Sequence, residues 1–171
     1  MITYSRATAQ HANAIAQLGK ETFRDSHKDS TTKENLDYFL NKNYDIDFIT
    51  KQLEDPKQLF HVAMYNDNVI AYSKIILNTK SILMQKEHIA YLEKLYVSAN
   101  FYGQKIGYSL FEINKKLAMQ EHQLGFWLNV WVGNERAIRF YEKLGFKKIG
   151  DTLFNITPTH ANPNYQMMIA F

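Results

Sequence analysis

One stretch constrains the fold of this chain more than any other, and it runs from His88 to Leu110. It begins as a β-rich alternating run, continues through a short loop that contains Gly103 and Gly107, and enters an amphipathic helix. This order presents free backbone N–H groups at the helix N-terminus, where they can bind a phosphate. The stretch therefore predicts a helix packed on a sheet and, as a first hypothesis, a phosphate-bearing cofactor.

The chain has 171 residues, of which 46% are hydrophobic and none is cysteine. These values predict one domain, residues 1–171, whose core needs no cross-link. Without cysteine the chain cannot form disulfides, cysteine-ligated zinc sites or a thiol nucleophile. The net charge of +3 comes from scattered Lys and Arg, so nucleic-acid binding is not indicated, although a positive cleft for an anionic ligand stays open.

No segment resembles a signal peptide, and none approaches the length of a membrane span. We therefore expect a soluble cytoplasmic protein that does not bind membranes. Aromatic residues near the C-terminus, Phe154 and Tyr165 among them, could form a homodimer contact or simply pack the last strands.

Hydrophobic periodicity divides the chain into strands and helices. The expected strands are 2–6, 59–65, 69–77, 89–97, 126–132, one beginning at 146, and 165–171. The expected helices begin near residues 8, 31, 45, 105 and 133. Asn66 to Asn68 are turn residues and predict a hairpin between the second and third strands. The outcome is an α+β fold, a mixed sheet with helices on both faces.

Several helix ends carry local signals. Thr31 and Glu34 have the spacing of a capping box, and Asp45 has the chemistry of an N-cap. Gly145 stands where a helix commonly ends in a left-handed residue. The side chains expected to face the core from the second and third helices are Leu36, Phe39, Leu40, Phe48, Ile49 and Leu53.

Strand alternation places a carboxylate on an apolar face of the strand at 89–97. One face is expected to hold Tyr91, Glu93, Leu95 and Val97, and the other Leu92, Lys94 and Tyr96. Two interpretations of Glu93 follow. It either pairs with a nearby lysine or lies at a wet strand end, which the residue taken alone favours, or it is a general base whose pKa is raised by apolar surroundings.

The loop from Tyr102 to Gly107 would let the backbone approach a diphosphate. It is not a P-loop, because no Gly-Lys-Ser/Thr follows, and it lacks the third glycine of the dinucleotide fingerprint. Lys105 could add a cation to the phosphates or be a solvated surface side chain.

In the helix after Val132, Asn134 and Tyr141 are separated by seven residues and share one face. Taken singly, Asn134 is expected to be an N-cap and Tyr141 a core aromatic residue. A tyrosine hydroxyl beside a departing thiolate could also donate its proton.

The segment from Val132 to Phe146 reads Val-x-Asn-x-x-Ala-x-x-Phe-Tyr-x-x-x-Gly-Phe. With the preceding strand, glycine loop, helix and apolar strand, it resembles the GNAT superfamily of acetyl-CoA-dependent N-acetyltransferases. The loop departs from the superfamily's Gln/Arg-x-x-Gly-x-Gly/Ala pattern, since Tyr102 and Lys105 replace two marked residues and Gly107 matches the third. The lysine is costly only if position 105 requires a positive φ, because its N–H donates as well as that of glycine.

The likeness covers nearly the whole chain, and the segments 21–27, 31–40 and 92–97 are most similar to PaiA-type spermidine/spermine acetyltransferases. It implies a mostly antiparallel sheet of about six to seven strands with one splayed pair, flanked by helices on both faces. It also implies a single N-acetyltransferase domain, acetyl-CoA as co-substrate, no metal, and a small-molecule amine acceptor such as a polyamine.

The resemblance also assigns cofactor-binding residues. The main chain of Leu95, Tyr96 and Val97 would pair with the pantetheine arm between the splayed strands. Asn134 would hydrogen-bond the pantetheine region, and Tyr141 would lie by the thioester sulfur. The residues expected around the diphosphate are Tyr102, Gly103, Gln104, Lys105, Ile106, Gly107 and Tyr108.

The expected reaction is direct transfer in a ternary complex. An alkylammonium, with a reference pKa of roughly 10.4, must lose a proton before attack, and Glu93 is the candidate base. A backbone N–H between Leu95 and Val97 is the nearest donor to the oxyanion. Tyr141 would then protonate the thiolate, whose reference pKa is roughly 8.5.

The acceptor stays open at this level. A polyamine would be met by acids, and the first two helices offer Glu21, Asp25, Asp29 and Glu34, each of which could equally be a solvated surface acid. The alternatives are an acetyltransferase for a peptide N-terminus, a lysine or an antibiotic amine. The rival of another class is a non-catalytic acyl-CoA-binding module, suggested by the altered loop.

Overall fold

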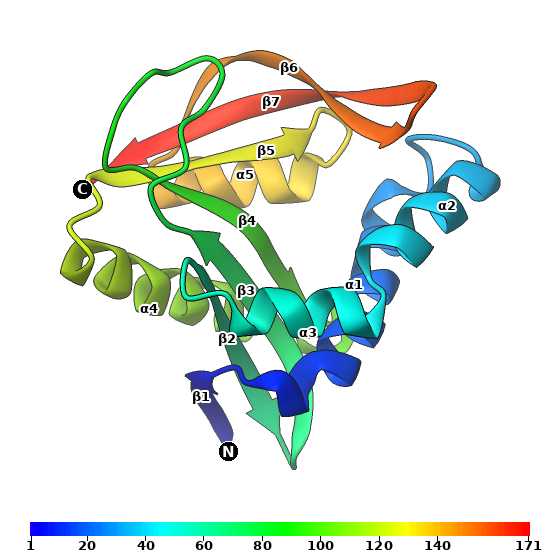
Figure 1. Ribbon diagram of the computed structural model, residues 1–171, viewed down its shortest axis with the longest axis vertical. Coiled ribbons are helices and arrows are strands. Elements are labelled where there is room, and N and C mark those ends of the chain that lie inside the picture. The colour runs from blue at the N-terminus through cyan, green and yellow to red at the C-terminus, as the bar shows by residue number, and fades with distance from the viewer.

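The seven strands of the computed structural model, which describes residues 1–171, form one open sheet in the order β1-β2-β3-β4-β5-β7-β6 (Figure 1). Every neighbouring pair is antiparallel except β4 and β5, which are parallel. The strands are β1 Ile2–Arg6, β2 Gln58–Tyr65, β3 Asn68–Ile76, β4 Ala90–Val97, β5 Gly125–Trp131, β6 Lys147–Thr157 and β7 His160–Ala170. The predicted mixed, mostly antiparallel sheet is confirmed.

Five α-helices accompany the sheet: α1 Ala12–His27, α2 Lys33–Asn43, α3 Ile46–Glu54, α4 Ile106–Gln120 and α5 Glu135–Leu144. Short 3-10 turns precede α1 at Ala9–His11 and α4 at Ala99–Phe101. The α4 helix connects β4 to β5, as a parallel pair requires a crossover. None of the helices combines the length and the hydrophobicity that a membrane span requires.

The hairpin and two of the helix ends form as their residues predict. Asn66 and Asp67 have φ values of 48° and 61°, the left-handed pair of a tight turn between β2 and β3. The Asp45 carboxylate accepts a hydrogen bond from the Phe48 N–H at 3.0 Å, and Gly145 ends α5 with φ 100°. These features depend on local chemistry alone.

Two local predictions are wrong. The N-cap of α2 is Thr32, whose hydroxyl accepts from the Asn35 N–H at 3.3 Å, while Thr31 accepts from the Asn35 side chain. Adjacent threonines offer two candidate caps, and the helix begins after the second. Phe48 is 43% exposed because the short α3 directs Ile49 into the core instead.

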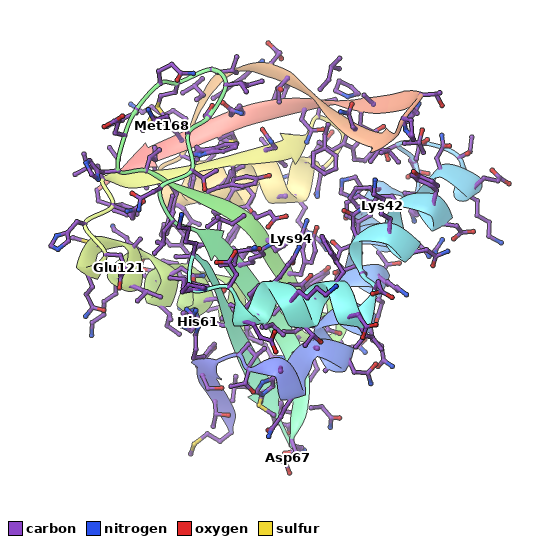
Figure 2. The ribbon with its side chains drawn as sticks, in the orientation of Figure 1. Lys42, His61, Asp67, Lys94, Glu121 and Met168 are labelled. Carbon is purple, nitrogen blue, oxygen red and sulfur yellow. The ribbon has the colours of Figure 1, made fainter.

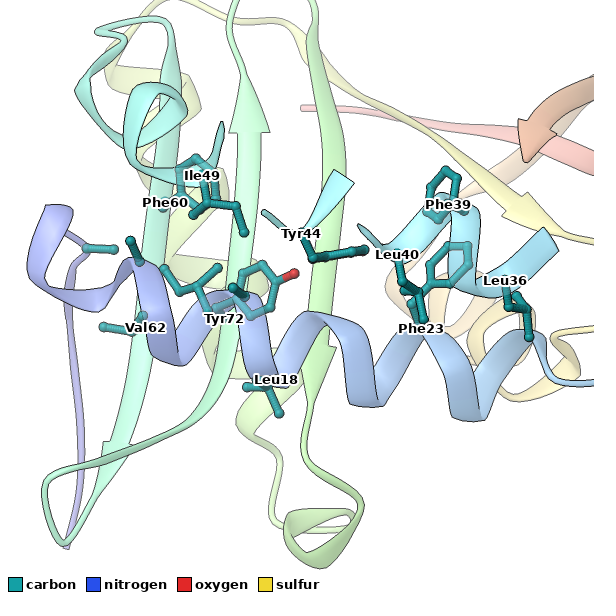
Figure 3. Packing of buried hydrophobic residues seen from close by; sticks show 14 of the residues in the cluster. Leu18, Phe23, Leu36, Phe39, Leu40, Tyr44, Ile49, Phe60, Val62 and Tyr72 are labelled. Carbon is teal, nitrogen blue, oxygen red and sulfur yellow. The ribbon is translucent and has the colours of Figure 1, made fainter. Parts of the chain in front are cut away.

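The first core cluster packs α1, α2 and α3 against β2 and β3 (Figure 3). The rings of Phe23 and Phe39 stack with centroids 4.5 Å apart, which joins α1 to α2. A side chain at Gly19 would overlap the ring of Tyr44 and lie 2.7 Å from the Tyr72 hydroxyl. This close approach seats α1 against β3 and against the end of α2, which itself packs against β6 and borders the site described below.

The second cluster joins α4 and α5 to strands β2 to β5 and β7. Phe111 of α4 packs edge-on against Phe126 of β5 and Phe146, with centroids 6.1 and 5.9 Å away. The loop between β3 and β4 covers the other face of β5, where the Trp127 indole N–H donates to the Thr79 carbonyl at 2.6 Å. The near-continuous apolar run of β5 therefore reflects burial on both faces, as predicted.

Candidate active site

The site begins where β4 and β5 separate. Their parallel pairing joins only Ala90 to Phe126 and Tyr91 to Trp127. On its other edge β4 stays paired with β3 as far as Val97. The edge of β4 that faces β5 therefore has no strand partner from residue 92 to residue 97, and the predicted splayed pair is present.

A β-bulge interrupts β4 at Glu93. The register passes from Ile75 opposite Leu92 to Lys74 opposite Lys94, which leaves Glu93 without a partner on β3. Because a bulge adds one residue to one strand, the alternation of side chains reverses beyond it. A strand that is read as a regular repeat is therefore assigned the wrong faces after the bulge.

The packing shows this reversal. Leu95 and Val97 pack with Ile106 and Leu110 of α4, whereas the Tyr96 ring packs edge-on against Tyr72 in the cluster under α1 to α3. The predicted grouping of Leu95 and Val97 with Glu93 is thus wrong. The α1–α3 face of β4 carries Tyr91, Glu93, Lys94 and Tyr96, and the α4 face carries Leu92, Leu95 and Val97.

Glu93 lies between two lysines. One carboxylate oxygen pairs with the Lys74 ammonium, and the other lies 3.6 Å from that of Lys94. Lys74 is only 2% exposed and donates to Gln52 of α3 at 3.0 Å. Burial would raise the pKa of Glu93, but Lys94 and Lys74 together outweigh it and the net pKa is lowered. The expected raised pKa is wrong, and pairing with lysine is the interpretation that the structure supports.

The loop before α4 has the backbone that binds anions. Gly103 has φ 79° and Lys105, the N-cap residue of α4, has φ 59°. The Lys105 side chain caps nothing, and the backbone N–H groups of residues 103–108 donate to no group of the chain. Free N–H groups at a helix start attract an anion such as a diphosphate. Position 105 therefore does take the positive φ that penalises a lysine there.

Arg136 is a neighbour of this loop that the sequence did not single out. Its guanidinium lies 4.0 Å from the centre of the Tyr102 ring and forms no ion pair, whereas Arg139 pairs with Glu135 at 3.0 Å. A Cβ on Gly107 would lie 3.4 Å from the Phe140 ring, so α5 lies against the start of α4. No sequence signal indicates Arg136, since its place depends on how these helices pack.

Asn134 and Tyr141 combine structural roles with available chemistry. The Asn134 side-chain oxygen accepts from the Ala137 N–H at 3.2 Å, so it caps α5 and keeps its amide N–H groups free to donate. Burial, followed by the neighbours Tyr96 and Tyr91, raises the pKa of Tyr141 well above its usual range. Tyr141 is therefore a protonated phenol, and its electrostatic neighbours Tyr91 and Tyr96 place it near β4.

A pocket of about 530 Å³ lies on the α1–α3 face at the bulge. Its walls are α2, the segment 154–158 at the end of β6, and the side chains of Tyr91, Glu93 and Lys94. Glu93 is its only acid. The acids expected to meet a polyamine, Glu21, Asp25, Asp29 and Glu34, are not among its lining residues.

His27, the last residue of α1, is a second group that the sequence did not single out. Its ring stacks on Phe23 at 3.9 Å and lies 5.7 Å from Trp131 at the end of β5. Burial, aided by the charge of Lys94, lowers the pKa of His27 to about 4, so the ring is neutral at pH 7. The only sequence signal is its spacing of four residues from Phe23.

No group of three or more His, Asp or Glu side chains is placed to hold a metal ion. The start of α4 offers free donors to a diphosphate, and the open edge of β4 offers them to an amide-containing arm. These two features, with a protonated tyrosine beside them, are those of an acyl-CoA-dependent transferase. The cofactor therefore fits the residues that are present.

Comparison with known proteins gives the family. Residues 13–146 match the family model described as Acetyltransferase (GNAT) family, and the chain belongs to that family. It is accordingly an N-acetyltransferase that uses acetyl-CoA as co-substrate. The predicted family, fold class and co-substrate are confirmed.

The relatives agree on the family, and the name of one of them states an acceptor. An uncharacterised N-acetyltransferase of Mycobacterium bovis is 25% identical over 151 residues, which are 88% of this chain and 92% of the relative. The solved PaiA N-acetyltransferase of Thermoplasma acidophilum, in complex with coenzyme A, is similar with a TM-score of 0.82 and 17% identity, covering 100% of this chain and 99% of its own. A ribosomal-protein-alanine N-acetyltransferase of Brucella melitensis has a TM-score of 0.76 and 17% identity, covering 99% of both chains. Such structural likeness shows the fold and does not select an acceptor.

Proposed function

We propose that the protein transfers the acetyl group of acetyl-CoA directly to a primary amine, with Glu93 as base and Tyr141 as acid. The early end of the β4–β5 pairing carries the proposal, because it leaves a strand edge open beside Tyr141. The same strand reaches the helix start, since a Cβ on Gly107 would lie 3.8 Å from the Val97 side chain. One cofactor could therefore use both features.

Different residues around the opening would bind different parts of the cofactor. The N–H groups of residues 103–108 would bind the diphosphate, with Lys105 and Arg136 as nearby cations. The main chain of residues 95–97 would pair with the pantetheine arm, and the free amide of Asn134 would donate to it. Bound acetyl-CoA would supply the reactive thioester.

The charges at the bulge would prepare the acceptor. Lys74 and Lys94 disfavour another ammonium nearby, so they would lower the pKa of an incoming amine. A weak base then suffices, and Glu93 could accept the amine proton through water even though its own pKa is lowered. Glu93 could therefore act as the base although its carboxylate is paired with lysines.

The remaining steps would take place at the open edge of β4. As the amine nitrogen bonds to the carbonyl carbon, the developing oxyanion would accept a hydrogen bond from a main-chain N–H of residues 95–97. Cleavage of the carbon–sulfur bond then leaves a thiolate, which Tyr141 would protonate. The resulting tyrosinate would recover a proton from solvent, and Glu93 would release the amine proton to solvent.

The acceptor would be a small-molecule or peptide amine. The segments similar to PaiA-type enzymes favour a polyamine, and the likeness to a ribosomal-protein-alanine acetyltransferase favours a peptide N-terminus. The pocket beside Glu93 has one acid, and that acid is already paired with lysines, which favours an acceptor of low positive charge.

The test is release of free thiol from acetyl-CoA in the presence of diamines, polyamines, amino acids and a peptide with a free N-terminus. Amine-dependent release together with the acetylated product would support the proposal. Tight binding of acetyl-CoA without turnover on any amine would refute it in favour of a non-catalytic acyl-CoA-binding module. Tyr141→Phe serves as the control that should bind the cofactor and turn over poorly.

A further inference from the structure

We propose that the pocket beside Glu93 selects primary amines that carry an anionic group, a carboxylate or a phosphate, at their far end. The inference rests on the proposed transfer of acetyl to an amine and names the class of acceptor. It is carried by the lining of the pocket, which combines one acid that is already paired with lysines, two cations and an aromatic wall.

The charges at the pocket are unequal. Lys42 and Lys94 line it, Lys74 lies behind Glu93, and Glu93 is the only acid, so three positive charges and one negative charge leave a net charge of +2. Both oxygens of Glu93 already face lysines. Lys42 forms no ion pair anywhere in the chain, and its charge remains available to a ligand.

Lys94 is well placed to bind an anion strongly. Only 14% of its side chain is exposed, and its ammonium lies 5.7 Å from the centre of the Tyr44 ring. Burial alone would lower the pKa of Lys94, but Tyr96 and Glu93 outweigh it, so the group stays charged. A charged group that is shielded from water interacts with an opposite charge more strongly than an exposed one.

The rest of the pocket suits a short apolar spacer. Tyr38 and Phe39 of α2 and Phe154 of β6 line it, and the rings of Phe39 and Phe154 pack edge-on at 5.7 Å. Figure 2 labels Lys42 on α2 and Lys94 on β4, the two elements that contribute the cations. A ligand with its amine near Glu93 could extend along the aromatic wall and bring an anion to Lys42.

Acids that could attract a polycation are committed elsewhere or lie outside the pocket. Asp37 of α2 pairs with Arg24 at 2.7 Å, and neither residue lines the pocket. A second ammonium on the acceptor would therefore meet Lys42 or Lys94 with no free carboxylate to balance it. The charge pattern disfavours a diamine and favours an amino acid of the same length.

The experiment compares acceptors that share one chain and differ at its far end: pentylamine, 1,5-diaminopentane, 5-aminopentanoate and 5-aminopentyl phosphate. We expect kcat/KM for at least one anionic amine to exceed that for the diamine by about tenfold or more. The ratio between the carboxylate and the phosphate identifies which anion the pocket accepts better.

The variant Lys42→Gln should raise KM for the favoured anionic amine about fivefold and leave its kcat and the KM for acetyl-CoA unchanged. It should hardly affect pentylamine, and Lys42→Glu should shift the preference toward the diamine. The matched control is Lys33→Gln, which removes a charge from the first turn of the same helix, outside the pocket.

Two results would overturn the inference. If 1,5-diaminopentane is the best acceptor, the selection for an anion is wrong while acetyl transfer to amines still stands. If no amine is turned over, the proposed function fails first, and calorimetric binding of the two anionic amines to the CoA-bound protein tests the pocket separately. Absence of binding, or binding that Lys42→Gln does not weaken, would then refute the pocket assignment.

Discussion

Lys105→Gly should have two effects: it should stabilise the folded protein and weaken its affinity for CoA. Lys105 has φ 59° and ψ 13°, a left-handed conformation that costs a residue with a side chain about 1 to 2 kcal/mol. Glycine removes this cost and loses about 0.5 to 1 kcal/mol through the greater freedom of the unfolded chain. The side chain is exposed, so its removal leaves no cavity. The net gain is about 0.5 kcal/mol, or 1 to 2 °C in Tm for a chain of this size.

Lys105→Ala separates the backbone from the charge. Alanine removes the same ammonium and keeps the left-handed strain, so it should be as stable as the wild-type protein or slightly less stable. Both variants should bind CoA about two- to fivefold more weakly than wild type at low salt, because each loses one exposed cation beside the phosphates. The two losses should be equal and should shrink as salt is added.

The measurements are urea unfolding for stability and titration calorimetry for CoA. If Lys105→Gly is no more stable than Lys105→Ala, the loop stores no backbone strain and the argument from φ fails. If both variants bind CoA like wild type at low ionic strength, Lys105 does not meet the phosphates. A larger loss of affinity in the glycine variant alone would show that loop stiffness, not charge, limits binding.

Three further predictions concern the reaction and the fold. Tyr141→Phe should lower kcat about 100-fold or more at unchanged CoA affinity, because the thiolate loses the acid that protonates it. The rate of thiol release gives kcat, and titration calorimetry gives the affinity for CoA. Glu93→Gln should lower kcat/KM at pH 7 and recover partly toward pH 9.5, where more of the amine is already deprotonated; an unaltered pH profile would remove the base role. His27→Gln should make the free energy of unfolding depend less on pH between 6.5 and 4. The pKa of His27 falls from 6.5 to about 4 on folding, so the neutral ring contributes about 3 kcal/mol at most to the free energy of unfolding. This contribution is complete above pH 6.5 and is lost as the pH falls toward 4.

Matched controls keep these results interpretable. Tyr165→Phe removes a phenol from β7 and should leave kcat unchanged, since Tyr165 packs under Lys148 with its ammonium 3.9 Å from the ring centre. His61 is buried and its pKa is also lowered, so it adds acid sensitivity of the same sign. The comparison for His27 is therefore wild type against variant at each pH, and equal slopes would refute its role.

The features that sequence predicted well are those that local chemistry decides. The left-handed turn at Asn66 and Asp67, the cap at Asp45 and the left-handed Gly145 each depend on residues within one turn of chain. The sequence shows that a lysine at position 105 is costly only at positive φ, but the φ itself depends on the backbone geometry of the folded loop.

The features that sequence missed depend on pairing between distant segments. The bulge at Glu93 is a property of the register between β3 and β4, and hydrophobic alternation carries no trace of one added residue. The ion pair of Glu93 with Lys74 and the stacking of Arg136 on Tyr102 likewise join segments that only the tertiary structure brings together. Strand periodicity therefore indicates Glu93 as a candidate acid but predicts the wrong neighbours for it.

The short parallel pairing of β4 and β5 divides the sheet mechanically into two plates. One plate is β1 to β4 and the other is β5, β7 and β6, and two residue pairs, Ala90 with Phe126 and Tyr91 with Trp127, are all that join them edge to edge. We expect amide hydrogen exchange to be faster at this seam than within either plate. A cofactor arm bound between the two plates would hold them together, so the protein should be more rigid with the cofactor bound than without it.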